Sequence, residues 1–290
     1  MLANDDDTGP PPESYQTVWK YDSDGELLDK FNLSPMTDLS AVAMADSDHL
    51  YAFNYLSSLR LISEETQQIV WEVQGLYACT LYLVSAADAG GNFVYGGSFD
   101  GDCYIVKYDQ SGELLWNWRY NPTIDGLCAV LDLAVDDQNN VVAAGDLWRL
   151  VSVDGFVVRL SDGGNVLWSK ELDTNHDQED LVKLAIGPQG DISVSGYTTP
   201  ADRLTMYLHS YGFAADGAPL WHDRYRDEVD DYVNITEKVA VDEEGNTYLW
   251  LGRSRIYRGK SAPYYSLRFN KYDSMGVLMW SRKIDRKSVV

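Results

Sequence analysis

The feature that most constrains this chain is an internal repeat built from two alternating hairpin signatures. The first places a glycine four residues before a tryptophan, as in YDQSGELLW at 108–116 and YDSMGVLMW at 272–280. Between β-rich runs, an Asp-x-x-Gly segment is a tight hairpin turn, because glycine accepts a positive φ and aspartate caps the turn. Further copies are LSDGGNVLW (160–168) and FAADGAPLW (213–221), while ISEETQQIVW (62–71) lacks the glycine and YDSDGELLD (21–29) has Asp29 in the tryptophan position.

The second signature is an alanine-centred strand, a turn and another strand, as in LAVDDQNNVVAAG at 133–145. Each repeat therefore supplies four short strands in two hairpins. Four antiparallel strands per repeat of about 40–50 residues is the blade of a β-propeller. Small alanines suit the innermost strand, and the tryptophan on the outermost strand could cover the seam between blades. When the turns are aligned, the recurring alanines are Ala43, Ala86, Ala134, Ala185 and Ala240.

These residues carry a family resemblance. An Ala-x-Asp-x-x-Gly-Asn hairpin followed by an Asp-x-x-Gly-x-x-x-Trp hairpin resembles the SBBP-type repeats of bacterial β-propellers, and it is also similar to quinoprotein (PQQ-type) propeller repeats. The copy at 153–198 is the closest, and the resemblance covers nearly all of 16–283. It implies an all-β propeller strongly and a function weakly, because propellers support many unrelated activities.

We expect residues 1–15 to be a disordered acidic, Pro-rich leader and residues 16–290 to be one propeller domain. Complete blades are predicted at 39–73, 80–118, 130–170, 182–224 and 237–283, with one further outer hairpin at 16–32. That hairpin leaves three arrangements open: a six-position ring with one incomplete blade, a five-bladed ring with an added hairpin, or a fragment of a longer propeller.

The net charge of −22 is divided unevenly along the chain. Residues 253–290 hold ten Lys/Arg and two acidic residues, a net of +8, so the remainder carries −30. The strong acidity argues against nucleic-acid binding. A basic last blade beside an acidic first segment could form an electrostatic latch or could simply be a solvated basic patch; exposed ion pairs contribute only about 0–1 kcal/mol each, so strand pairing would have to hold a ring shut.

The sequence gives only indirect evidence on the cellular compartment of the protein. The chain has no apolar run long enough for a membrane span, and its first residues lack the basic and apolar regions of a signal peptide. We expect an exported bacterial protein, extracellular or periplasmic, with the leader as a surface tether or an ordinary frayed terminus. The three cysteines fit either one disulfide with a free thiol or three reduced thiols, and their spacing argues against a zinc site.

Binding is expected on the face that carries the long loops, because function in repeat folds concentrates where loops vary. Aromatic side chains there could stack on sugars, and arginines could hold a carboxylate or sulfate. Acidic loops around 173–180 and 227–231 could hold Ca²⁺ but lack EF-hand spacing, so no cofactor or metal is predicted. The candidate ligand-binding residues are Trp148, Arg149, His176, Asp177, Tyr197, Tyr232, Arg253, Arg255 and Tyr257.

The predicted function is a monomeric, non-catalytic module that binds a protein or carbohydrate partner through the long-loop face. No nucleophile elbow, phosphate loop, dinucleotide fingerprint or His-Glu-x-x-His motif is present, so the sequence predicts no catalytic residue. The alternative is a polysaccharide hydrolase or lyase with its active site at the central funnel, since catalytic groups of a propeller enzyme can come from separate blades. A purely structural module is a third possibility.

Overall fold

The structure, a computed structural model, describes residues 16–21, 24–33, 39–54, 58–66, 68–77, 81–121, 126–150, 152–172, 178–199, 207–225, 232–257 and 260–284. The predicted leader, residues 1–15, lies outside them. Every regular element in the described part of the chain is a β-strand. None of the described segments is a helix long and apolar enough to span a bilayer.

In the described part of the chain, consecutive strands form five four-stranded antiparallel units, two of which are joined into one eight-stranded sheet, and one separate two-stranded hairpin. This is the pattern of a β-propeller, so the predicted fold class is confirmed, and each four-stranded unit is one blade. The hairpin consists of β1 (Gln16–Tyr21) and β2 (Leu27–Leu33). Blade 1 consists of β3 (Leu39–Met44), β4 (His49–Asn54), β5 (Ser58–Ser63) and β6 (Ile69–Gln74). Blade 2 consists of β7 (Leu81–Ala87), β8 (Phe93–Phe99), β9 (Asp102–Tyr108) and β10 (Leu114–Tyr120).

Blade 3 consists of β11 (Leu127–Val135), β12 (Val141–Trp148), β13 (Val153–Leu160) and β14 (Val166–Leu172). Blade 4 consists of β15 (Gln178–Ile186), β16 (Ile192–Thr199), β17 (Tyr207–Phe213) and β18 (Pro219–Tyr225). Blade 5 consists of β19 (Tyr232–Val241), β20 (Thr247–Tyr257), β21 (Lys260–Tyr272) and β22 (Leu278–Ile284). One parallel pair, Val153 with Gln178, joins the sheets of blades 3 and 4.

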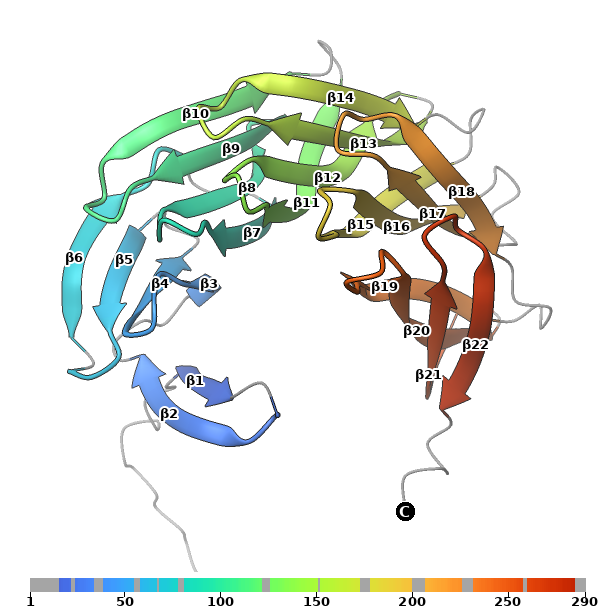
Figure 1. The fold of residues 1–290 in the computed structure, drawn as a ribbon, viewed down its shortest axis with the longest axis horizontal. Helices are drawn as coiled ribbons and strands as arrows, with labels where there is room; N and C mark the ends of the chain where they lie inside the picture. The colour runs from blue at the N-terminus through green and yellow to red at the C-terminus, as the bar shows by residue number, and fades with distance from the viewer. Residues whose placement is uncertain are drawn as a thin grey trace, which may run out of the picture.

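The blades follow one another around an arc (Figure 1), with the first strand of each blade on the inside and the fourth on the rim. The β1–β2 hairpin stands beside blade 1 at one end of the arc, and blade 5 stands at the other end, across an opening. An ion pair between Lys20 and Glu64, 2.5 Å long, ties the hairpin to blade 1.

Apolar side chains of the middle strands alternate between the two faces of each blade, so the core lies between blades rather than at one centre. In blade 2, Phe93 and Tyr95 pack against Tyr51 and Phe53 of blade 1, whereas Val94 between them packs toward blade 3. Comparable clusters join blades 3 and 4 and blades 4 and 5. Each seam is therefore a packed interface of its own.

The short turns of a blade meet on one face of the disc. Gln110, in the outer turn of blade 2, donates a hydrogen bond from Nε2 to the carbonyl oxygen of Gly90 in the inner turn (2.6 Å). The other connections, such as those that follow Tyr120 and Trp148, leave from the opposite strand ends. They are not consistently longer than the turns, because strands extend into segments expected to be long loops: Arg253, Arg255 and Tyr257 lie in β20, which ends three residues before β21 begins. The two faces therefore differ in position, but the predicted difference in loop length is wrong.

Candidate ligand-binding cleft

Arg149 lies at the tip of the β12–β13 hairpin on the long-loop face, where its amide donates to the carbonyl of Ser152 (2.8 Å). Its guanidinium contacts two carboxylates: Nη2 donates to Glu171 at 2.6 Å, and Nη1 pairs with Asp154. The hydrogen bond that Arg149 donates to Glu171 raises the pKa of Arg149. Two carboxylates therefore hold the Arg149 guanidinium in place at the end of blade 3 where β12 turns into β13.

A cleft of about 270 Å³ opens beside this network, at the seam between the last strand of blade 2 and the outer strands of blade 3. Its floor is the apolar side of the seam, and its rim carries a carboxylate, an ammonium and a hydroxyl group. This combination of an apolar floor and a few polar groups is typical of small-ligand sites. The lining residues are Trp118, Tyr120, Leu147, Phe156, Val158, Val166, Ser169, Lys170 and Glu171.

Two parallel aromatic rings form one wall of the cleft. Trp118 and Tyr120 point to the same side of β10 because alternate residues of a strand share a face. Their ring planes lie 7° from parallel, with the ring centroids 6.0 Å apart. Both side chains are half-buried and pack against the core of the blade 2–blade 3 seam. The two parallel rings therefore line the cleft from a position packed against the core.

Glu171 connects Tyr120 to the charged network. The hydroxyl of Tyr120 donates to Oε1 of Glu171 (3.1 Å), while Arg149 binds Oε2 of the same carboxylate. Burial and the contact with Glu171 raise the pKa of Tyr120. The cleft therefore presents a neutral phenol and the Glu171 side chain, which Tyr120 and Arg149 hold in place.

The other predicted site residues do not gather at this cleft. Trp148 ends β12, half-buried and opposite Val153, and Tyr197 is half-buried on β16 in blade 4. Tyr232 and Arg255 are paired directly across β19 and β20, and Arg253 and Tyr257 lie on the same strand, β20. These four therefore share one hairpin of blade 5, away from Arg149. His176 and Asp177 lie outside the described residues.

The cleft residues Trp118, Tyr120 and Glu171 were not predicted from the sequence. A signal was present: Trp116, Trp118 and Tyr120 alternate along the outermost strand of blade 2, which places three rings on one face. Only Trp116 belongs to the repeat signature, and its indole donates to the carbonyl oxygen of Asp162 in the next blade (2.7 Å). Of the two extra aromatic residues, Tyr120 has a counterpart in Tyr225 of blade 4, whereas Trp118 has none on the outermost strands of the other complete blades, so Trp118 carries information beyond the fold.

One of the described innermost strands carries an ionisable group with a raised pKa, Asp132. Asp132 lies on β11, the innermost strand of blade 3, and accepts a hydrogen bond from the amide of Leu184 on the innermost strand of blade 4 (2.9 Å). Burial raises its pKa, against the opposing influence of this hydrogen bond and of Lys183 and Lys238. In the part of the chain that the structure describes, no three His, Cys, Asp or Glu side chains are placed to hold a metal ion.

Cys103 and Cys128 form a disulfide that joins β9 of blade 2 to β11 of blade 3. Of the two alternatives that the sequence left open, the structure has the one with a disulfide. The bond crosses the same seam that carries the cleft, so it holds the two walls of the cleft together.

No protein-family model matches the sequence, and no curated protein matches it. Solved structures do match in fold. A protein of unknown function from Bacteroides caccae superposes with a TM-score of 0.51 at 12% identity, covering 90% of this chain and 87% of that one. The Dos1 propeller gives a TM-score of 0.55 at 11% identity over 92% of this chain and 62% of that one.

The quinohemoprotein alcohol dehydrogenase of Comamonas testosteroni gives a TM-score of 0.58 at 13% identity, over 94% of this chain and 58% of that one. This chain therefore spans about three fifths of the length of the Dos1 and dehydrogenase chains. At such low identity the likeness concerns the fold alone. The chain has a β-propeller fold, similar to propellers that include a quinoprotein.

Proposed function

We propose that this β-propeller is a non-catalytic binding module of an exported bacterial protein, and that it binds a carbohydrate in the cleft between blades 2 and 3. The observation that carries the proposal is the pair of parallel aromatic rings, Trp118 and Tyr120, lining a cleft that also has charged groups in its lining. A sugar ring has a flat face of C–H groups that packs on an aromatic ring, and hydroxyl groups at its edge that bond to carboxylate and guanidinium groups.

The size of the cleft favours a sugar over a protein partner. Its volume of about 270 Å³ lies near the lower end for small-ligand sites, enough for one or two sugar units. A stable protein interface would instead need roughly 800 Å² of surface from each partner. The polar rim also matches a ligand with many hydroxyl groups better than an apolar cofactor.

Export is supported by the disulfide between Cys103 and Cys128, because such bonds persist in oxidising compartments. Membership of the SBBP-type repeat proteins belongs to the same proposal and rests on the repeat motif. A surface tether through residues 1–15 and a monomeric state also remain part of it.

Glycan-array screening followed by titration calorimetry tests the proposal. Trp118→Ala should abolish binding of the selected glycan, and Glu171→Gln should weaken it because the rim loses its charged acceptor. Tyr225→Ala is the matched control: Tyr225 occupies the position of Tyr120 in blade 4, where its hydroxyl accepts from Arg268 at 2.7 Å. Binding that survives Trp118→Ala, with the variant still folded by thermal unfolding, would rule out this cleft.

The alternative function, a polysaccharide hydrolase or lyase at the funnel, has the raised pKa of Asp132 in its favour. The same glycans provide its test. Release of reducing ends by the wild-type chain, lost in Asp132→Asn and retained in Trp118→Ala, would support the enzyme over the binding module.

A further inference from the structure

Blade 4 has two histidines in contact, on the face that packs toward blade 3. His209 lies on β17 and His222 on the neighbouring strand β18. Nδ1 of His209 is 3.1 Å from Nε2 of His222, and the two ring centroids are 5.1 Å apart. Because the two strands are hydrogen-bonded to each other, the sheet itself sets the distance between the two imidazoles.

Tyr211 holds both imidazoles in place. It is paired directly with His222 across the two strands, and the two rings are stacked with their centroids 4.4 Å apart and their planes 3° from parallel. The hydroxyl of Tyr211 also lies 3.2 Å from Nδ1 of His209. Two imidazole nitrogens and a phenol oxygen therefore gather at one place on the blade.

This polar cluster stands where blade 3 has apolar core. His209 takes the position of Phe156, since each residue lies opposite the glycine of the second strand of its blade. Tyr211 takes the position of Val158, two residues further along the same strand. Phe156 and Val158 both belong to the apolar cluster of the blade 2–blade 3 seam. The propeller repeat therefore does not need an imidazole or a phenol at these positions.

A fourth polar group lies on the same face of blade 4. Thr198 on β16 is paired with Tyr207, the residue two positions before His209, and it replaces Leu147 of blade 3. Its side chain is fully buried, and its hydroxyl has no hydrogen-bond partner in the described part of the chain. A buried hydroxyl without a partner is costly, so this face favours a polar occupant.

The charges around the histidines are mixed. Burial lowers the pKa of both imidazoles, so both are neutral at neutral pH, which is the form that binds a metal ion. Arg224 also lowers both pKa values, whereas Asp223 raises that of His222. The guanidinium of Arg224 is stacked on the ring of Tyr207, 3.7 Å from its centroid. The net charge of −22 over the whole chain favours the approach of a cation.

We propose that His209 and His222 bind a divalent transition-metal ion such as Zn²⁺, with the Tyr211 hydroxyl as a third ligand and water in the remaining position. Imidazole nitrogens suit zinc, copper and nickel, whereas Mg²⁺ and Ca²⁺ prefer oxygen ligands. With metal–nitrogen bonds of about 2.0–2.1 Å, nitrogens 3.1 Å apart subtend roughly 95–100° at the ion, between the octahedral and tetrahedral angles.

An ion can reach the cluster from solvent, because His222 is exposed on the rim strand. The ion replaces the hydrogen bond between the two imidazoles, and its bound water can supply a partner for the Thr198 hydroxyl. The cluster lies one seam away from the cleft between blades 2 and 3 and shares no lining residue with it. This metal site therefore goes beyond the proposed glycan binding and does not depend on it.

Zinc titration of the full chain tests the proposal. Any histidine purification tag is removed, the protein is stripped with EDTA and dialysed, and Zn²⁺ is titrated in competition with a chromophoric chelator. We expect one Zn²⁺ per chain, and no displacement of it by Mg²⁺. His222→Gln removes one ligand and should weaken zinc binding by at least about tenfold. Zinc should also raise the melting temperature of the wild type and not that of His222→Gln.

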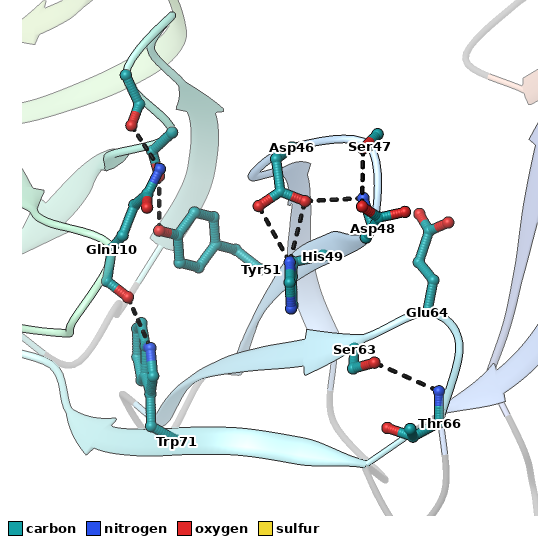
Figure 2. Close-up of polar contacts among 12 residues, drawn as sticks. Asp46, Ser47, Asp48, His49, Tyr51, Ser63, Glu64, Thr66, Trp71 and Gln110 are labelled. Atoms are coloured by element: carbon teal, nitrogen blue, oxygen red, sulfur yellow. Dashed lines mark hydrogen bonds and ion pairs between the residues drawn. The ribbon is translucent and has the colours of Figure 1, made fainter.

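The other two histidines of the sequence, His49 and His176, are the matched controls. Figure 2 shows His49 at the inner turn of blade 1, where Nδ1 lies 3.0 Å from both carboxylate oxygens of Asp46. The double variant His49→Gln/His176→Gln should keep the zinc affinity of the wild type. Thermal unfolding of each stripped variant shows whether it is folded before metal is added.

Electron spin resonance of the protein loaded with one Cu²⁺ gives a second readout. The spectrum should show coupling to two imidazole nitrogens in the wild type and to one in His222→Gln. Equal zinc affinity in the wild type and in folded His222→Gln would overturn the proposal. So would loss of zinc binding in the double variant of His49 and His176, or a wild type that binds no zinc.

Discussion

Lys107 illustrates how single residues bind one blade to the next. Its ammonium lies 2.7 Å from Asp88 in the inner turn of its own blade and 2.5 Å from Asp162 in the outer turn of blade 3, and the side chains of Lys107 and Asp88 are both fully buried. Arg159 pairs with Asp136 at the same position in blade 3. In blade 4 both members are glycines, Gly187 and Gly212. Each of these blades therefore has both members of the ion pair or neither.

Lys107→Met should lower the free energy of unfolding by about 3–5 kcal/mol, because it leaves the Asp88 carboxylate buried without a cation. Lys271→Met is the matched control at the same position of blade 5. There the ammonium and Asp242 are 3.5 Å apart and partly exposed, so the loss should stay below about 1 kcal/mol. Urea unfolding of both variants checks this, and equal losses would contradict the account of burial.

His209 should make stability depend on pH. Its Nδ1 lies 3.1 Å from Nε2 of His222 and 3.2 Å from the hydroxyl of Tyr211, and burial lowers its pKa to about 4. The unfolded chain binds this proton near pH 6.5 and the folded chain only near pH 4, so the contribution is present above pH 6.5 and is lost as the pH falls between these values.

We expect this one group to remove roughly 3 kcal/mol of stability by pH 4. His209→Gln does not titrate, so the difference between the unfolding free energies at pH 7 and pH 4.5 should be smaller for the variant than for the wild type. Carboxylates affect both proteins alike and cancel in the comparison. An equal pH dependence in the two proteins would contradict the assignment.

Single residues also mark the limit of sequence reasoning. Arg149 was predicted because it lies in a long connection, whereas Trp118 and Tyr120 were missed because aromatic residues on a rim strand are usually packing between blades. What separates them from ordinary packing residues is the parallel placement beside Glu171, which depends on the relative position of two blades. A local sequence pattern cannot show how two blades are placed relative to each other.

At the scale of the strand and turn, the repeat signature predicted the elements well. Asp-x-x-Gly turns, alternating apolar runs and the recurrent alanine defined hairpins that the structure confirms, since each of these signals acts within a few residues. The pairing of tryptophan with the glycine of the following blade could not be read within one repeat. It depends on how neighbouring blades are placed, as where Trp116 of blade 2 packs on Gly164 of blade 3.

Gly164→Ala should cost more than its backbone conformation alone explains. The positive φ costs about 1–2 kcal/mol for any other residue, and crowding against the Trp116 ring should add about 1–3 kcal/mol. Gly245→Ala is the control, with a similar φ of 78° and ordinary contact with Ser274 at 3.4 Å. Thermal unfolding should therefore give Gly164→Ala a lower melting temperature than Gly245→Ala. The reverse order would contradict the packing of Trp116 on Gly164.

At the scale of the whole molecule, the seams are both the core and the site. The blade 2–blade 3 seam carries an apolar cluster, the disulfide and the cleft, so the propeller supplies a rigid frame and the departures from its repeat supply the chemistry. Blade order follows from the sequence. The opening of the arc does not, because the sequence left three arrangements of the first hairpin open.

Hydrogen–deuterium exchange with and without a glycan selected on the array tests the central claim that ligand binds between blades 2 and 3. Protection should appear in peptides that cover 117–120 of β10 and 169–172 of β14, and should be absent in Trp118→Ala. Protection confined to the innermost strands β11, β15 and β19 would place the ligand in the funnel and would contradict the claim.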